Sequence, residues 1–419
     1  MKHKLDIQIF QHSLKNGLKV ILLPDSSLPI ISYYTFFRVG SRNERPGITG
    51  ISHLFEHMMF KGSKKYPEGI FDKILTANGG FSNAYTSRDM TVYYQVFPNQ
   101  LLPQIIDMEV DRLSGLNISE ESLESERQVV IEERLLRTDN SLEGFLMEQL
   151  YANAYVAHPY QWPIIGWLSD LQQISLPQCL EYHKIYYAPN NAILAIGGDF
   201  NPEQVLTQIE SAYETVPAQV SPPPVVTKEP PQAGEKRITI HKEAQHPYLY
   251  IAYHSIPATD PNLAALDMFQ MIFNTGRSSR LVSRLVEKEK IANNVYGAFG
   301  YDIDPGLYYF VIELKSDNNF NKVIEILDEE LEKVDKNSLT DEEIQKAINI
   351  LITDYYHNFT TVENKVHEIG RSGLLFDDPS KILDFPEKYN RVKKKDIIDI
   401  KNQIFTMENR TVIQVIPKK

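Results

Sequence analysis

Short runs of alternating apolar and polar residues open the chain and predict β-strands. Two such runs within residues 7–25 flank Asn16-Gly17, a dipeptide that favours the tight turn of a β-hairpin. A third run at 31–40 predicts a further strand, and runs at 81–85 and 91–96 predict two more. The first part of the chain is therefore predicted to form a sheet.

Between and after these strands, apolar residues recur at every third or fourth position, as in helices that pack one face on a core. Mixed strand and helix runs return in the second half, which begins with strands at 237–243 and 247–256 and ends with one at 411–417. This order predicts an α+β fold of two duplicated domains, each a mixed or antiparallel sheet with helices packed on one face. In the rest of the first half we expect helices at 50–62, 71–78, 100–113, 120–137, 175–187 and 201–216, and one strand at 191–200.

A proline-rich segment at 217–234 separates the two halves. Proline lacks the backbone N–H that a strand ladder or a helix interior needs, so closely spaced prolines predict a stiff, extended linker. The predicted domains are therefore residues 1–216 and 235–419, joined by this linker.

The composition, with 42% hydrophobic and 23% charged residues, is that of an ordinary globular protein. No stretch reaches the roughly 18 apolar residues that a membrane span requires. The net charge of −12 argues against a nucleic-acid partner, because phosphate backbones attract basic surfaces. The first residues lack the apolar middle of a signal peptide, so we expect a cytoplasmic location, or a periplasmic one if a signal was removed.

Cys179 is the only cysteine of the chain. It rules out an internal disulfide and a metal cage built from thiolates. Its surroundings follow the amphipathic pattern of the helix expected at 175–187. We therefore expect a buried structural thiol rather than a nucleophile.

His53, Glu56 and His57 share one side of the helix expected at 50–62. Residues three and four positions apart lie about one turn apart, so both imidazoles point the same way. Two neutral imidazoles in this arrangement can occupy two corners of a zinc tetrahedron, and the carboxylate beside them can accept a proton from the attacking water. The order H-x-x-E-H inverts the commoner H-E-x-x-H zinc motif. The motif lies in the first predicted domain and has no counterpart in the second.

A catalytic zinc ion needs a third protein ligand, and the acidic helix expected at 120–137 offers candidates. Glu126 and Glu133 are two helical turns apart on one face, beside the apolar Val129 and Val130. Carboxylates within an otherwise buried stripe need a cationic partner, which a metal ion can supply. The alternative is that this helix presents an ordinary solvated face of charged residues.

Residues 39–63, VGSRNERPGITGISHLFEHMMFKGS, resemble the metal-binding motif of the M16 (pitrilysin-like) metallopeptidases. The resemblance implies a zinc ion held by His53, His57 and a glutamate far along the chain, and Glu133 lies at the spacing from His57 that the family uses. Glu126 matches a glutamate that supports the site without binding the metal, and Glu56 matches the general base. The expected function is a zinc-dependent endopeptidase that cleaves unfolded peptides or leader segments.

The resemblance extends over nearly the whole chain. Residues 79–94 look like the strand at the edge of the family's active site, in which Asn83 and Ala84 match positions that bind the substrate backbone. An exposed edge strand can accept an extended peptide as an additional strand. From the residues alone, Asn83 would be an ordinary residue near a strand end.

The second domain departs from the family pattern at two positions. Members of the family carry an arginine and a tyrosine there, which reach the substrate and the developing oxyanion. In this chain Val286 stands at the arginine position and Asn293 at the tyrosine position. Valine donates no hydrogen bond and asparagine is too short to replace a tyrosine hydroxyl, so one half of the expected site is missing.

Two arrangements could complete such a site. In the first, which we expect, the chain forms a heterodimer with a homologous subunit that supplies the arginine and the tyrosine, a division of labour that short family members use. In the second, the chain acts alone or as a homodimer, with Arg284 or another donor as the substitute. A non-catalytic scaffold or peptide-binding subunit is a further alternative, and the complete metal motif argues against it.

Overall fold

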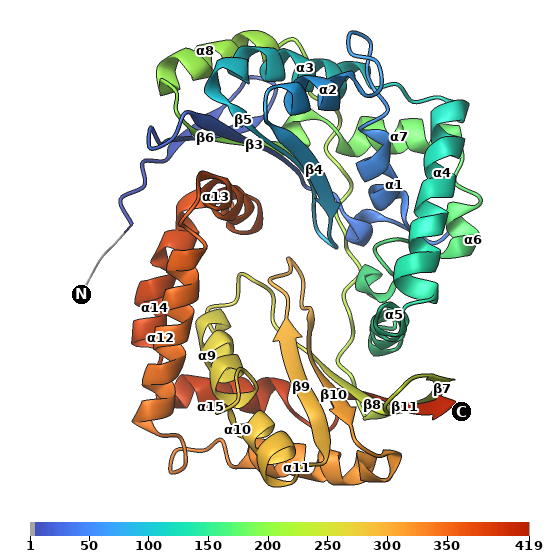
Figure 1. The fold of residues 1–419 in the computed structure, drawn as a ribbon, viewed down its shortest axis with the longest axis vertical. Coiled ribbons are helices and arrows are strands. Elements are labelled where there is room, and N and C mark those ends of the chain that lie inside the picture. The colour runs from blue at the N-terminus through green and yellow to red at the C-terminus, as the bar shows by residue number, and fades with distance from the viewer. Residues whose placement is uncertain (1–4, 419) are drawn as a thin grey trace. The chain divides into compact units, whose positions relative to one another are not determined.

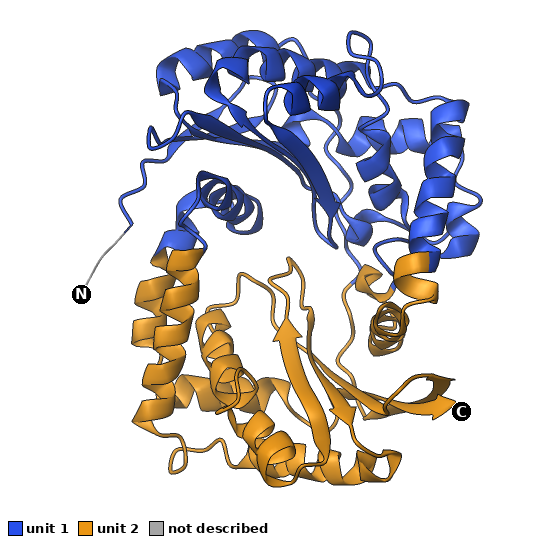
Figure 2. Cartoon of the chain, in the orientation of Figure 1, with its two compact units in different colours: residues 1–135, 162–227, 358–383 blue, residues 136–161, 228–357, 384–419 orange. Residues whose placement is uncertain are grey.

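A computed structural model describes residues 5–418 and shows an α+β fold, as predicted (Figure 1). Two compact units each contain one sheet (Figure 2). Within the described residues, unit 1 is formed by residues 5–135, 162–227 and 358–383, and unit 2 by residues 136–161, 228–357 and 384–418. In the described part of the chain, no helix is long and apolar enough to cross a membrane.

In the part of the chain that the structure describes, the sheet of unit 1 has six strands in the order β1-β2-β6-β3-β5-β4, so β4 lies at one edge. Strands β2 and β6 run parallel, and all other neighbours are antiparallel. Gly17 adopts a φ of 87° in the turn between β1 and β2, which confirms the predicted hairpin. The strands are β1 (Phe10–Ser13), β2 (Lys19–Pro24), β3 (Ile30–Phe37), β4 (Phe81–Thr86), β5 (Thr91–Pro98) and β6 (Ala192–Gly198).

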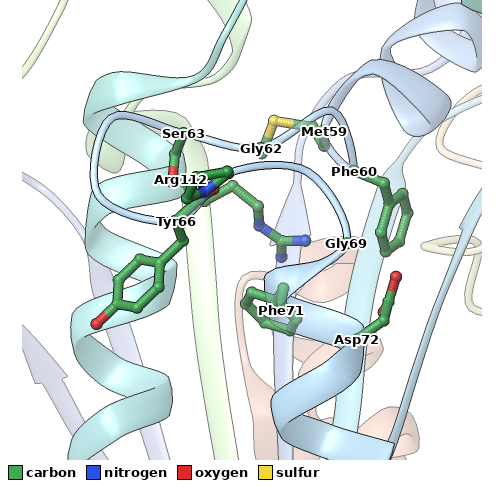
Figure 3. A pocket seen from close by; sticks show the side chains of 10 residues that line it. Met59, Phe60, Gly62, Ser63, Tyr66, Gly69, Phe71, Asp72 and Arg112 are labelled. Atoms are coloured by element: carbon green, nitrogen blue, oxygen red, sulfur yellow. Dashed lines mark hydrogen bonds between the residues drawn. The ribbon is translucent and has the colours of Figure 1, made fainter.

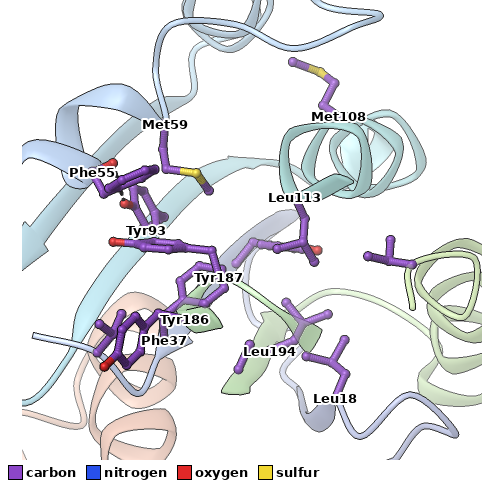
Figure 4. Packing of buried hydrophobic residues seen from close by; sticks show 14 of the residues in the cluster. Leu18, Phe37, Phe55, Met59, Tyr93, Met108, Leu113, Tyr186, Tyr187 and Leu194 are labelled. Atoms are coloured by element: carbon purple, nitrogen blue, oxygen red, sulfur yellow. Dashed lines mark hydrogen bonds between the residues drawn. The ribbon is translucent and has the colours of Figure 1, made fainter. Parts of the chain in front are cut away.

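Most helices of unit 1 cover one face of this sheet (Figure 1). The core between them contains large aromatic side chains, among them Phe37, Phe55, Tyr93 and Tyr187 (Figure 4). Cys179 is fully buried in this core, and burial raises the pKa of its thiol to about 12, so it is a structural residue as predicted. Helices α1 (Ile51–Met58), α2 (Ile70–Ala77) and α8 (Pro202–Tyr213) contact the strands of the sheet. Helix α3 (Leu102–Gly115) packs on α8, α4 (Glu120–Arg134) and α7 (Leu176–Tyr186) pack on α1, and α6 (Leu168–Leu171) packs on α4.

One helix of unit 1, α13 (Val362–Phe376), packs on β3 and β6 from the opposite face of the sheet (Figure 1). Small residues allow this close packing: a Cβ on Gly370 would lie 2.3 Å from the ring of Phe36, and one on Gly197 would lie 2.3 Å from Val366. Lys365 anchors the same helix through an ion pair with Asp25 at 2.6 Å. The prediction placed helices on one face only, and α13 adds a helix on the other.

Unit 2 repeats the topology of unit 1. Its sheet has the order β7-β11-β8-β10-β9, with β7 and β11 parallel, which matches β2-β6-β3-β5-β4 strand for strand in chain order. The duplication that the sequence predicted is thus present in the fold. The strands are β7 (Lys236–Glu243), β8 (Tyr248–His254), β9 (Ala292–Phe299), β10 (Leu307–Leu314) and β11 (Arg410–Lys418). The helices are α5 (Leu142–Ala154), α9 (Leu263–Phe273), α10 (Arg280–Val282), α11 (Phe320–Glu332), α12 (Asp341–His357), α14 (Phe385–Arg391) and α15 (Lys394–Ile404).

Two segments lie outside the half of the chain to which the sequence assigned them. Helix α5 precedes the proline-rich segment but packs on β7, β8 and β11 of unit 2, whereas α13 follows that segment but belongs to unit 1. The compact units therefore differ from the predicted borders 1–216 and 235–419 by the exchange of residues 136–161 and 358–383. Residues 217–234 contain no helix or strand, and the border between the units falls within them.

Candidate metal centre

Helix α1 carries the H-x-x-E-H motif, and its first turn is fixed by a buried carboxylate. Glu44 accepts hydrogen bonds from the backbone amides of Gly50 and Ser52, both at 2.8 Å, and so satisfies two amides that a helix N-terminus leaves open. Gly50 has a φ of 88°, and a Cβ there would lie 2.4 Å from the carbonyl oxygen of Ile165. The motif therefore begins at a defined residue with a defined orientation.

Helix α4 carries the distant glutamates, and two arginines set its position along the neighbouring loop. Arg134 donates to the carbonyl oxygen of Gly166 at 2.7 Å, and Arg127 donates to the carbonyl oxygens of Leu171 and Ile174. The side chain of Ser119 accepts from the amide of Ser122 and caps the start of the helix. Arg127 and Arg134 directly follow Glu126 and Glu133 in the chain, so these bonds fix the part of the helix that carries both carboxylates.

The side chains of His53, His57 and Glu133 converge in unit 1. Oε2 of Glu133 lies 3.6 Å from Nε2 of His53 and 3.3 Å from Nε2 of His57. One ligand atom from each residue fits within 4.8 Å of the others. Among the described residues, no other group of three or more His, Cys, Asp or Glu side chains converges in this way. Two imidazole nitrogens and one carboxylate oxygen are a donor set typical of catalytic zinc, so the residues fit this ion.

Glu126 supports the cluster from behind His57. Its Oε2 lies 3.4 Å from Nδ1 of His57, the ring nitrogen that faces away from Glu133, and its Oε1 pairs with Lys61 at 3.1 Å. A carboxylate on the second ring nitrogen fixes the tautomer and the orientation of a metal-binding histidine. On the same helix Val130 is buried and Glu132 is exposed, but Val129, expected beside the buried stripe, is 46% exposed.

The two carboxylates also change the acidity of the imidazole between them. Burial alone lowers the pKa of His57, but the hydrogen bonds and charges of Glu126 and Glu133 outweigh it and raise this pKa to about 9. Without a metal ion His57 is therefore protonated at neutral pH. A bound cation would replace this proton, because an imidazole ligand must be neutral.

Glu56 occupies the remaining position of the motif, partly buried beside Thr86 of β4. Burial raises the pKa of its carboxyl, and the negative charge of Glu133 acts in the same direction, while Thr86 and His57 lower it. A carboxylate with a raised pKa is a stronger base. Glu56 is therefore suited to accept a proton from a water molecule at the cluster.

Comparison with known proteins identifies the family. Residues 20–166 match the family described as Insulinase (Peptidase family M16), and residues 173–351 match the one described as Peptidase M16 inactive domain. The chain belongs to peptidase family M16. The zinc protease PqqE of Helicobacter pylori is 32% identical over 414 residues, which cover 97% of this chain and 92% of that protein.

Solved structures of M16 proteins share the fold. The crystal structure of a protease from Helicobacter pylori superposes with a TM-score of 0.92 at 30% identity and covers 98% of this chain and 100% of that one. A peptidase M16 inactive domain from Pseudomonas fluorescens has a TM-score of 0.85 at 18% identity and covers 98% of each chain. The latter likeness concerns the fold alone.

In this M16 chain, the residues predicted to bind substrate lie on β4. Asn83 pairs with Tyr94 and Ala84 with Tyr93 across the ladder to β5. No strand of the described residues pairs with the outer side of β4. The amide of Ala84 donates to Oδ1 of Asn83 at 2.8 Å, so the Asn83 side chain occupies an acceptor position at this strand.

The two departures from the M16 pattern lie in unit 2. Val286 is part of a π-helical segment, Ser283–Lys288, and the exposed Asn293 of β9 donates to Oε1 of Glu313 at 2.9 Å. Arg284, considered as a substitute donor, forms ion pairs with Glu289 at 3.1 Å and with Glu329 at 3.7 Å. Its charge is thus already engaged within unit 2.

A small cavity of about 20 Å³, with room for about one water molecule, lies beside the loop between α1 and α2 (Figure 3). The buried guanidinium of Arg112 lies between the rings of Phe60 and Phe71, 5.8 and 5.2 Å from their centres, and pairs with Glu109 at 2.7 Å. None of His53, His57 and Glu133 lines this cavity. Its contacts hold the loop that leads from α1 to α2.

Several residues that shape the centre were not singled out in the sequence. Glu44, Arg127, Arg134 and Thr86 belong to them, and each acts through contacts with residues far along the chain or on another element. Only Glu44 carried a local signal, since an acid shortly before a helix start can satisfy open amides.

Replacement of Glu126 by glutamine is expected to weaken zinc binding about 10- to 100-fold, because His57 loses the carboxylate that orients its ring. Zinc competition against a chelating dye measures this change. The matched control is Glu132→Gln on the exposed side of the same helix, which should bind zinc like the parent chain. Equal affinity of the Glu126→Gln variant and the parent would contradict the supporting role.

Proposed function

We propose that this M16 chain is the catalytic subunit of a zinc-dependent endopeptidase that cleaves unfolded peptides or leader segments. The observation that carries the proposal is the convergence of His53, His57 and Glu133, with the carboxylate of Glu56 on the same helix. The names of its relatives, among them a zinc protease, support this proposal.

His53, His57 and Glu133 would hold the zinc ion. When bound, zinc makes water more acidic and polarises a carbonyl group. Glu56 accepts the proton of the attacking water and later returns it to the leaving amine. Glu126 keeps His57 in the tautomer that presents Nε2 to the cluster.

The outer side of β4 is the proposed binding place for the peptide. Thr86 of this strand lies beside Glu56, so a peptide added along β4 would pass the catalytic base. A carbonyl group of that peptide could accept from the Ala84 amide in place of Oδ1 of Asn83. Binding through backbone groups suits unfolded substrates, because it requires no particular side chain.

We propose that the active form is a heterodimer with a homologous subunit. Val286 and Asn293 supply neither of the two donors expected at their positions, and Arg284 is engaged with Glu289. The partner would provide an arginine and a tyrosine to stabilise the oxyanion. Loss of a single donor of this kind lowers kcat about 100- to 1,000-fold in well-studied hydrolases.

The test compares zinc-loaded chain alone with the chain mixed with a homologous subunit that carries the arginine and the tyrosine. We expect slow hydrolysis of unstructured fluorogenic peptides by the chain alone and a rate at least about 100-fold higher in the mixture.

The possible outcomes separate the proposals. Full hydrolysis by the chain alone, unchanged by the partner, would contradict the heterodimer and leave the peptidase. Stoichiometric zinc without hydrolysis in either preparation would contradict the peptidase and favour a peptide-binding subunit.

A further inference from the structure

Three aromatic side chains form a row across the strands at one edge of the sheet in unit 1. The rings of Tyr34 on β3 and Tyr94 on β5 stack with their centres 4.8 Å apart. Phe81 on β4 meets Tyr94 edge to face at 6.4 Å. We call Tyr34, Tyr94 and Phe81 the aromatic row. Each contact joins neighbouring strands, so the row follows the direction in which strands are added to the sheet.

The aromatic row is covered at its inner end and open at its outer end. Tyr34 is only 3% exposed and lies beside His367 of α13, with ring centres 5.7 Å apart. Phe81 is 47% exposed and belongs to β4, the last strand of the sheet. A large exposed aromatic side chain at this place lacks the neighbour that one more strand would provide.

Side chains alternate along β4, and the two sides of the strand have different neighbours. Phe81, Asn83 and Tyr85 share the side of the aromatic row, where the hydroxyl of Tyr85 forms a hydrogen bond of 2.8 Å with Nε2 of His367 on α13. On the opposite side Ser82 donates to Asp72 of α2, and Thr86 lies beside Glu56. A peptide along β4 would show the same alternation.

We propose that Phe81 is a specificity-determining residue, which selects an aromatic or large aliphatic side chain of the peptide. This inference rests on the proposed function, because it takes the occupant of the β4 edge to be the substrate. A peptide residue opposite Phe81 would extend the aromatic row by one member. An aromatic residue stabilises a sheet when it faces another aromatic or a β-branched residue on the neighbouring strand, because the contact removes the surfaces of both side chains from water.

The position of the selected residue follows from the length of the strand. Thr86 lies beside the catalytic base, and Phe81 stands at the other end of β4. At about 3.3 Å per residue the two positions are roughly 16 Å apart. The selected side chain should therefore lie about four to six residues from the scissile bond.

The test uses a set of unstructured peptides with one fixed cleavage site, in which phenylalanine, leucine, alanine or aspartate is placed at each position in turn. Binding is measured by fluorescence anisotropy with zinc-loaded Glu56→Gln chain, and kcat/KM is measured with the parent chain in the assembly that gives the highest rate. We expect phenylalanine or leucine at one position, four to six residues from the cut, to strengthen binding about tenfold over alanine.

Variants assign this preference to Phe81. Phe81→Ala should abolish it without changing zinc content, and Phe81→Leu should keep much of it. The matched control is Phe10→Ala, which removes a phenylalanine of similar exposure, 41%, from β1 at the opposite edge of the same sheet. It should leave the preference intact.

Each failure has its own signature. A preference that survives Phe81→Ala, or binding that depends on no position, overturns the role of Phe81 while hydrolysis by the parent chain upholds the peptidase. A position preference in binding without any hydrolysis, by the chain alone or with the homologous subunit, overturns the peptidase and upholds the peptide site. Absence of peptide binding by the zinc-loaded chain contradicts both.

Discussion

Replacement of Glu56 by glutamine is expected to lower kcat by about 10² to 10⁴, with zinc content unchanged. A positioned general base contributes a factor of this size, and glutamine cannot accept the proton. Glutamine has nearly the same volume as glutamate, so the buried surroundings of α1 should not rearrange. Glu56 is not one of the three converging ligand residues, and its loss should leave His53, His57 and Glu133 in place.

The measurement pairs peptide hydrolysis with zinc analysis of the same samples, in the assembly that gives the highest parental rate. The Glu56→Asp variant keeps a carboxylate but places it one methylene further from the water, so its rate of peptide hydrolysis should lie between those of the parent and Glu56→Gln. Glu132→Gln, an exposed glutamate on α4, should match the parent in both measurements. A rate for Glu56→Gln close to that of the parent would exclude Glu56 as the base.

The local sequence pattern could reveal only those residues of the metal centre that lie on a single helix. His53, Glu56 and His57 lie within two turns of α1, so their spacing alone places them together. Glu133 lies on α4, and its approach to α1 depends on the packing of two helices that are far apart in the chain. Spacing could not supply this contact. The pattern of the acidic helix offered both Glu126 and Glu133 as candidates, and only the family resemblance selected Glu133 as the ligand.

Packing between helices also explains why Val129, expected beside a buried stripe, is exposed. It lies about one turn from Glu126, as does Val130, but only Val130 is buried. The angular difference between the two positions on a helix is about 100°, which the sequence pattern of this charged helix does not resolve. The position of α4 is set by Arg127 and Arg134, whose acceptors are backbone carbonyl oxygens between residues 166 and 174. A backbone acceptor leaves no mark in the pattern of side chains.

The strands and most helices were predictable because each follows one clear period. Helix α5 was not among the predicted elements, and for the region that contains α13 the pattern predicted a single tail helix before the final strand. Buried residues of α5 mix with partly buried ones, such as Phe145 and Met147, on several sides of the helix. Helix α13 packs through Gly370 and Gly373, which have low helix propensity. Their places in the fold are determined by contacts with a sheet from the other half of the chain.

Replacement of Glu133 by alanine is expected to weaken zinc binding by more than 100-fold and to abolish hydrolysis. Even a residue that merely orients a ligand contributes about 10- to 100-fold to metal affinity, so loss of a ligand itself should cost more. Two imidazoles would remain, whereas catalytic zinc sites use three protein ligands. The negative charge that faces Nε2 of both His53 and His57 would also disappear.

Two measurements check this expectation independently of activity. Zinc retained after dialysis against a chelator should be stoichiometric for the parent chain and for Glu132→Ala, and close to zero for Glu133→Ala. Added zinc should raise the thermal unfolding midpoint of the first two proteins but not of the third, because a ligand stabilises the folded state only as far as it binds there. Glu132 neighbours Glu133 on α4 but is exposed, so the pair separates loss of a ligand from loss of a charge on the helix. Full zinc retention by Glu133→Ala would show that the cluster does not hold the metal, and the proposed chemistry would fall with it.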